Sequence, residues 1–149
     1  MTIASLLARK GPKVVTVQPE QTIRQALALL AEHNIGALVV VDPEGRPVGI
    51  LSERDVVRTA VRDEAVFTKT VSALMTRDVI LGVPQDDLES VGRTMTDKHI
   101  RHLPVVDQRR LVGIISIGDV VKAQRDLYRG EVENLQMELT EEHGRPTGR

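Results

Sequence analysis

The sequence contains no cysteine and no tryptophan, and Phe67 and Tyr128 are its only aromatic residues. The lack of cysteine excludes disulfide bonds and thiolate metal sites, although it leaves the redox compartment open. Two aromatic rings provide no stacking platform for single-stranded nucleic acid, so a planar ligand must lie between aliphatic side chains. Twenty basic and 21 acidic residues give a formal net charge of -1, which argues against nucleic acid as a partner.

Long apolar runs are also missing. Runs such as Ala37 to Val41 are far too short to cross a membrane, and the N-terminus lacks the basic start and apolar core of a secretory signal. We therefore predict a soluble cytoplasmic protein with no membrane partner. A chain of 149 residues can form one compact core. Its apolar residues are mostly Val, Leu, Ile and Ala, which suits buried strands covered by helices.

An internal repeat organises the chain. Residues 19–57 match residues 84–121, with a shift of 65 positions before a turn and of 64 positions after it. For example, Val-Gly-Ile at residues 48–50 recurs at residues 112–114. A deletion of one residue in the turn explains the change of register, because hairpin loops tolerate changes in length.

Each copy predicts the same order of elements: strand, helix, β-hairpin and helix, preceded by a short helical lead. Thr22 and Gln25 form a capping box before apolar positions at helical spacing. Apolar segments on both sides of a turn with Pro43 and Gly45 predict an antiparallel hairpin. The expected leads are 3–8 and 71–75, the expected strands 14–17, 37–41, 47–51, 79–83, 103–106 and 111–115, and the expected helices 22–34, 52–61, 87–99 and onward from 116.

A unit of about 60 residues is too small to bury both faces of its sheet. We therefore predict the fold class α/β (α+β), with two βαββα units that pack sheet to sheet with pseudo-twofold symmetry and enclose two equivalent clefts. The first repeat is expected at residues 1–65, the second at 66–128, and a C-terminal helix and tail at 129–149. That helix has apolar residues near a spacing of seven, so it could pair with a second copy, lie along its own module or fray. Residues 144–149 are expected to be disordered.

Two related motifs stand where a predicted strand ends and a helix begins: Gly-Ile-Leu-Ser-Glu-Arg-Asp at 49–55 and Gly-Ile-Ile-Ser-Ile-Gly-Asp at 113–119. In each, Ser with Asp three positions later fits a helix capping box, which needs no ligand. Their duplication, the glycine in the strand and the free amides at the helix start favour a ligand instead. Asp at this position would repel phosphate but could accept hydrogen bonds from the two neighbouring hydroxyls of a ribose.

These paired motifs resemble a tandem CBS-domain (cystathionine β-synthase-type) protein, the two-copy assembly known as a Bateman module, over residues 3–122. The resemblance implies a non-catalytic regulatory module that binds AMP, ADP, ATP or NAD as a regulatory ligand and requires no cofactor. It implies that Asp55 and Asp119 hold ribose hydroxyls, while Ser52 and Ser116 contact ribose or phosphate. The purine would lie against strand residues, namely Thr16, Val17, Ala37, Leu38, Ile80, Leu81, His102 and Leu103.

The two copies differ in basic residues. The second has Arg101-His102-Leu103-Pro104 where the first has Gly-Ala-Leu-Val, and Arg54 in the first motif corresponds to a glycine in the second. Arg54, Arg101 and His102 therefore offer the best match to a phosphate, and we place the ligand-facing basic charge on one side only. Unequal affinities in the two clefts are expected.

Other chemistries are matched less well. His99 and His102 are three positions apart, but the expected helix ends near His99 and no carboxylate or cysteine completes a metal site. Dinucleotide-fold, P-loop and hydrolase motifs are missing, so we predict that the chain is not an enzyme. The alternative is a ligand-free scaffold or protein-interaction module whose motifs are only helix caps. A regulatory fragment of an enzyme is disfavoured, because the chain has no room for a catalytic domain.

The family resemblance also implies a homodimer in which four CBS units form a flat disk. Ligand binding would change the angle between the copies. The C-terminal helix or an unidentified protein effector would then receive the signal.

Overall fold

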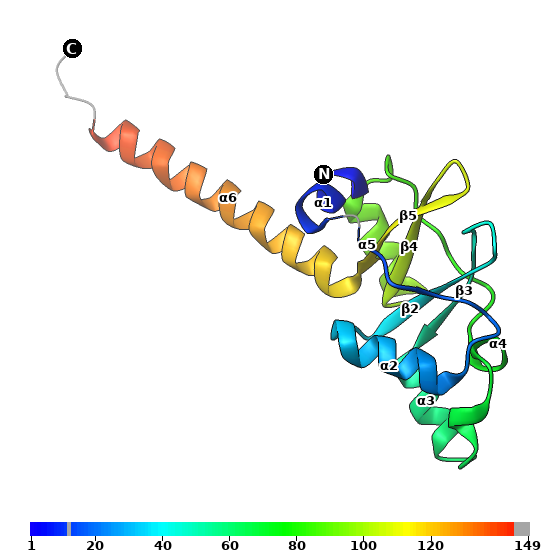
Figure 1. Ribbon diagram of the computed structural model, residues 1–149. Helices are drawn as coiled ribbons and strands as arrows, with labels where there is room; N and C mark the ends of the chain where they lie inside the picture. Colours follow the sequence, from blue (N-terminus) through cyan, green and yellow to red (C-terminus); the bar gives the residue numbers. More distant parts are fainter. Residues whose placement is uncertain (12, 145–149) are drawn as a thin grey trace.

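The computed structural model describes residues 1–11 and 13–144, and its elements follow the repeat (Figure 1). The first copy comprises β1 (Thr16–Val17), α2 (Ile23–His33), β2 (Ala37–Val41), β3 (Pro47–Ser52) and α3 (Glu53–Ala60). The second comprises α5 (Leu88–Asp97), β4 (His102–Asp107), β5 (Arg110–Ser116) and α6 (Ile117–Gly144). The leads are α1 (Ile3–Lys10) and α4 (Val71–Leu74), and the short 3-10 helix η1 (Val66–Thr68) precedes α4. The tail at 145–149, for which disorder was predicted, lies outside the described residues.

Equivalent helices begin and end alike in the two copies. The predicted capping box at the start of α2 is confirmed, with both reciprocal hydrogen bonds between Thr22 and Gln25. The chain leaves α2 through Asn34 and α5 through His99, both in the left-handed region with φ of 52° and 56°. This conformation lets a following backbone N–H close the last helical turn. His99 therefore lies beyond the end of α5 at Asp97, whereas the predicted helix extended to His99.

The two hairpins show why the repeat changes register. Residues 42–46 separate the paired Val41 and Pro47 of the first hairpin, whereas residues 107–110 separate Val106 and Leu111 of the second. The predicted deletion of one residue in the turn is thereby confirmed. Both hairpins also carry a register shift at the same place, directly before these pairs. The two hairpins therefore share this irregularity and differ in the length of the turn.

The strand predicted at residues 79–83 is wrong except for one parallel bridge between Gly82 and Val105. There the Gly82 N–H donates to the carbonyl of Pro104, and the Val106 N–H donates to the carbonyl of Gly82, both at 2.9 Å. Proline has no N–H, so Pro104 cannot donate the next hydrogen bond of the ladder toward the start of the predicted strand. The first copy has valine at the equivalent position, and there β1 pairs with β2 over two residues.

The helical leads exchange copies. Although α1 precedes the first copy, its Ile3 and Leu6 are buried in the hydrophobic cluster of the second copy, beside α5 and β4. Conversely, α4 follows the first copy and remains packed on it, through Val71 and Met75. Each copy is therefore completed by the lead that precedes the other copy in the sequence. The N-terminal residues consequently stabilise the second copy.

The motif glycines make room for these leads. A Cβ atom on Gly49 would lie 2.6 Å from the sulfur of Met75, and one on Gly113 would lie 2.7 Å from Cδ2 of Leu7. The backbone of Thr76 also pairs with β3 beside Gly49, through two hydrogen bonds with Ile50 of 3.0 and 2.9 Å. The prediction that these glycines admit a ligand is therefore corrected, because protein atoms occupy the space.

Each sheet has one face covered by helices, and α1 is among those that cover the second sheet. In the first copy, Leu38, Val40 and Leu51 are fully buried against α2. The alternate residue Val39 is also 0% exposed, yet it belongs to neither helix-covered cluster. Figure 1 shows the two sheets side by side in the centre, with α2 and α3 outside one and α1 and α5 outside the other. The predicted two-unit architecture is confirmed, and α6 extends from it as a long arm.

Candidate ligand clefts between the two copies

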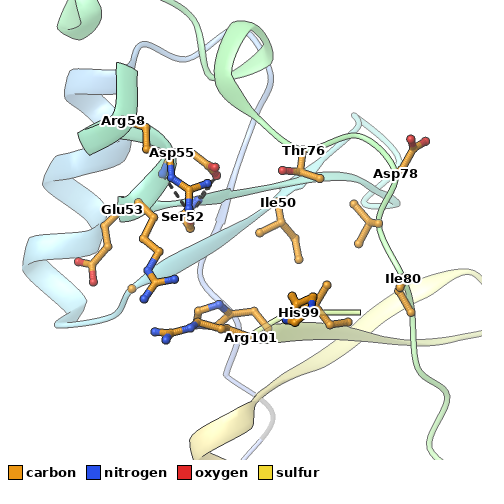
Figure 2. A pocket seen from close by; sticks show the side chains of 15 residues that line it. Ile50, Ser52, Glu53, Asp55, Arg58, Thr76, Asp78, Ile80, His99 and Arg101 are labelled. Carbon is orange, nitrogen blue, oxygen red and sulfur yellow. Dashed lines mark hydrogen bonds between the residues drawn. The ribbon is translucent and has the colours of Figure 1, made fainter. Parts of the chain in front are cut away.

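Cleft 1 lies between the copies and has a volume of about 430 Å³. The end of β3 and the start of α3 contribute Ser52, Arg54 and Asp55, while the segment before β4 contributes Arg101 and, at the strand itself, His102. Figure 2 shows the motif side chains on one side of this cleft and Arg101 on the other. Aliphatic side chains complete its lining, namely Ile50, Val79, Ile80 and Ile100.

Cleft 2 is the equivalent space around the second motif, with a volume of about 320 Å³. Ser116 and Asp119 line it from the second copy, and Ala37 lines it from the first. His102 lines both clefts, so a single side chain lies between the two candidate sites. The structure therefore brings together nine predicted residues in two spaces that the repeat relates. Five of them belong to the two motifs, and the others are Ala37, Ile80, Arg101 and His102.

Both motifs form the predicted capping boxes. The Ser52 N–H and hydroxyl donate to Oδ2 of Asp55, each at 3.0 Å, and the Asp55 N–H donates to the Ser52 hydroxyl at 3.3 Å. Around the second motif, the Ser116 N–H donates to Oδ2 of Asp119 at 2.8 Å, and the Asp119 N–H donates to the Ser116 hydroxyl at 3.0 Å. The boxes use one carboxylate oxygen of each Asp. Within the described residues, Oδ1 of Asp55 has no hydrogen bond, so it can accept one from a ligand.

Asp119 has a partner that Asp55 lacks. The ammonium group of Lys10, at the end of α1, lies 2.6 Å from Oδ2 of Asp119 and donates to the carbonyl of Ile114 at 2.8 Å. Burial alone would raise the pKa of Asp119, but the hydrogen bonds from Lys10 and Ser116 outweigh it and hold that pKa below its ordinary value. Asp119 is therefore ionised and paired at neutral pH.

His102 is uncharged at neutral pH. Burial lowers its pKa below the ordinary value, and the positive charges of Lys10 and Arg101 lower it further, against the opposing effect of Asp119 and Glu53. The prediction that His102 supplies positive charge to a phosphate is corrected for this reason. In cleft 1 the permanent cations near the motif are instead arginines.

The charge of His102 gives a stability prediction. Because its pKa is lower in the folded chain than the ordinary 6.5, the unfolded state binds the proton more tightly. The free energy of unfolding should thus be highest above this pH and fall as the pH drops below it. Urea denaturation of His102→Gln is expected to show a weaker fall than the unaltered chain. His99→Gln is the control. If the free energy of unfolding fell equally with decreasing pH in all three proteins, this account would be contradicted.

Several predicted residues lie outside both clefts. Val17, Leu38 and Leu103 are buried in the helix-covered clusters, so their side chains point away from the space between the copies. Thr16 is exposed on β1, Leu81 faces other hollows of the surface, and Pro104 is buried within β4. The first-copy counterpart of Ile80 at the repeat shift of 65 is Val15, and this residue, not Thr16 or Val17, lines cleft 2.

Five basic or imidazole residues in the clefts were not predicted, and His99 of cleft 1 is one of them. Arg58 lines cleft 1 one helical turn after Arg54, and that spacing could have identified it. Lys10, Lys13 and His33 line cleft 2. The prediction that basic charge is confined to one side is therefore wrong. No local motif identifies Lys10, because its position depends on the exchange of α1 onto the second copy. In the described part of the chain, no three His, Cys, Asp or Glu side chains are grouped to hold a metal ion.

Known proteins share both the repeat and the fold. The profile of the CBS domain matches residues 7–62 and 71–126. The chain belongs to the CBS-domain family. It is similar to the CBS domain-containing protein YhcV of Bacillus subtilis, with 38% identity over 75% of this chain and 79% of that protein. Proteins of this kind, built from a CBS-domain pair, are regulatory modules.

Solved CBS structures superpose on this chain. The CBS-domain containing protein ATU1752 from Agrobacterium tumefaciens has a TM-score of 0.80 and 42% identity, over 83% of this chain and 99% of that one. The CBS domain pair of protein MJ0100, solved with 5-methylthioadenosine and S-adenosyl-L-methionine, gives 0.74 and 30%, over 88% and 98%. CBSX2 in complex with AMP gives 0.72 and 28%, over 85% and 98%. Among the described helices of this CBS-domain chain, none is long and apolar enough to span a bilayer.

Proposed function

We propose that this chain is a non-catalytic cytoplasmic regulatory module that binds an adenine nucleotide or related adenosyl ligand (AMP, ADP, ATP or NAD) between its two repeats. The observation that carries the proposal is the carboxylate of Asp55, which faces cleft 1 with an oxygen that has no protein partner within the described residues. Two relatives of the same fold are described with AMP and with 5-methylthioadenosine and S-adenosylmethionine, and these ligands share an adenosyl group.

The chemistry of cleft 1 suits such a ligand. Its volume of about 430 Å³ lies within the range of small-molecule pockets. Asp55 would accept hydrogen bonds from the ribose hydroxyls, and the adenine would lie between Ile50 and Ile80. Arg54 of the first copy and Arg101 of the second would pair with a phosphate, because guanidinium groups bind phosphate oxygens in a bidentate manner.

This placement supports a regulatory role for the ligand. The ribose would be held by the first copy through Asp55, while the phosphate would also contact Arg101 of the second copy. A ligand that contacts both copies favours the angle between them at which both sets of contacts form. The repeats at 1–65 and 66–128 would thus act as the moving parts, and α6 or a protein effector would receive the change.

We further propose a homodimer with a disk of four CBS units, and α6 supports an association between chains. Its Tyr128, Leu135 and Met137 are 67%, 59% and 62% exposed, although they are apolar or aromatic. Sedimentation velocity of the full chain is expected to give a species of twice the chain mass of 16.4 kDa. Leu135→Glu should weaken the dimer if α6 contributes, with Lys122→Glu as a charge-changing control. A monomer at all concentrations would contradict the dimer.

The alternative function is a ligand-free scaffold. One observation favours it: in both motifs the Ser and the Asp already form the reciprocal hydrogen bonds of a capping box, which need no ligand. Thermal unfolding separates the two. A nucleotide present at about 100 times its dissociation constant stabilises a folded protein by roughly 2.7 kcal/mol. We expect a clear rise in melting temperature with at least one of AMP, ATP, NAD and S-adenosylmethionine, whereas a scaffold would melt at the same temperature with each of them.

A further inference from the structure

The two motif aspartates differ in what already binds them. Lys10 donates to Oδ2 of Asp119 at 2.6 Å, and the two side chains are 33% and 26% exposed. Lys10 also donates to the carbonyl of Ile114 at 2.8 Å, so two contacts hold its ammonium group inside cleft 2. Among the described residues, Asp55 of cleft 1 forms no salt bridge. The clefts are related by the repeat, but only in cleft 2 does the motif aspartate, Asp119, have a cationic partner among the described residues.

The fold fixes Lys10 in this position. α1 packs on the second copy, and its Leu7 fills the space beside Gly113 in β5. Lys10 follows Leu7 by three residues and lies at the C-terminal end of α1, where the helix dipole favours a positive charge. Gly11 then ends the helix with φ of 97°. Lys10 is therefore delivered to Asp119 by a packed helix and not by a free chain end.

A ligand with a ribose meets a different charge balance in cleft 2 than in cleft 1. Lys10 donates to Oδ2 of Asp119, so a pair of ribose hydroxyls that uses both carboxylate oxygens competes with Lys10 for Oδ2. A neutral nucleoside that displaces Lys10 leaves the ammonium group without its anion in a partly buried site, which is unfavourable. A ligand phosphate can replace Asp119 as the partner of Lys10, and Lys13 adds a second cation to the cleft.

We propose that Lys10 makes cleft 2 selective for adenosyl ligands that carry an anionic group over neutral nucleosides. When the ribose hydroxyls bind Asp119, the ammonium group of Lys10 forms an ion pair with the ligand anion in place of its ion pair with Asp119. This selectivity rests on the proposed function of the clefts. Cleft 1 has no such requirement, because Asp55 is free of a cation, so the two sites of one chain respond to different sets of ligands.

Titration calorimetry with adenosine and AMP tests the selectivity. An Asp55→Asn background removes the ribose carboxylate of cleft 1 while the amide oxygen can still accept from Ser52, so the remaining heat reports on cleft 2. In this background, Lys10→Met is expected to bind adenosine more tightly and AMP less tightly. The preference for AMP should fall by about twofold to fivefold, the upper part of the range measured for exposed ion pairs. Lys13→Met is the control, expected to weaken AMP without any gain for adenosine.

Three results would overturn the proposal. One is an unchanged preference for AMP in Lys10→Met, and another is equal weakening of both ligands, which would make Lys10 a structural residue only. The third is an Asp55→Asn chain that does not bind AMP while the unaltered chain does, since cleft 2 would then be closed to nucleotides. Failure of the unaltered chain to bind AMP or any other adenosyl ligand would instead contradict the proposed function itself.

Discussion

Asp55→Ala is expected to weaken AMP binding to cleft 1 by about a hundredfold to ten-thousandfold. Two hydrogen bonds from ribose hydroxyls to an ionised carboxylate would be lost, each of roughly 1.5–3 kcal/mol, and every 1.4 kcal/mol corresponds to about a factor of ten. The substitution also removes the acceptor that Ser52 uses in the capping box. We therefore expect a loss of about 1 kcal/mol of stability. Calorimetry and urea denaturation measure the two effects separately.

Two further variants separate the roles of this carboxylate. Ser52→Ala removes the hydroxyl that caps α3, so it should cost stability like Asp55→Ala but retain more of the AMP affinity. Asp78→Ala removes another carboxylate that lines the same cleft and forms no cap, and it should leave AMP affinity unchanged or slightly higher. If Asp55→Ala loses stability and binds AMP as the unaltered chain does, the motif is a helix cap alone.

Ile3→Ala is expected to lower the free energy of unfolding by about 2–5 kcal/mol, a large part of the 5–15 kcal/mol that stabilises a typical domain. Ile3 is 0% exposed and lies in the hydrophobic cluster of the second copy, next to Gly82 and Leu103. The substitution leaves a cavity between α1 and that copy. It also loosens the helix that carries Lys10, so cleft 2 should lose part of its selectivity in the same variant. Urea denaturation measures the loss of stability.

Val61→Ala provides the matched control for this prediction. Val61 is also β-branched, but it is 83% exposed at the end of α3. A surface substitution of this kind usually changes stability by no more than about 0.5 kcal/mol. Equal effects of Ile3→Ala and Val61→Ala would show that α1 does not complete the second copy.

The features that the sequence predicted best are local or repeated. The capping boxes depend on two residues three positions apart, so Thr22 with Gln25 and Ser52 with Asp55 identify them without knowledge of the fold. The first hairpin was predicted in the same short-range way, from Pro43 and Gly45 in its turn. Duplication of these signals then predicts two similar units, because each unit must cover the sheet of the other.

The missed features depend on contacts between distant residues. The alternating strand residues Leu38 and Leu103 were assigned to the ligand, yet they face the helices, and the sequence alone does not say which face of a strand points inward. The charge state of His102 depends on its burial and on four charged neighbours from both copies. Lys10 reaches Asp119 across 109 positions of sequence. In contrast, Pro104 was visible in the sequence and would have predicted the shortened strand pairing at Gly82.

The differences between the clefts give the repeat its regulatory potential. Arginines from both copies line cleft 1, but among the described residues none forms a salt bridge with Asp55. In cleft 2, Lys10 forms a salt bridge with Asp119. His102 lines both spaces, so a ligand in one cleft contacts a side chain that also borders the other. If both clefts bind ligands as proposed, this shared residue would give occupancy of one site a physical route to change the affinity of the other.

Titration calorimetry of the unaltered chain with AMP tests the central claim most directly. We predict saturable binding with at least one site per chain, lost from cleft 1 in Asp55→Ala and retained in Asp78→Ala. The absence of binding heat with AMP, ADP, ATP, NAD and S-adenosylmethionine, from a chain that unfolds cooperatively, would contradict an adenosyl-binding role for the two clefts.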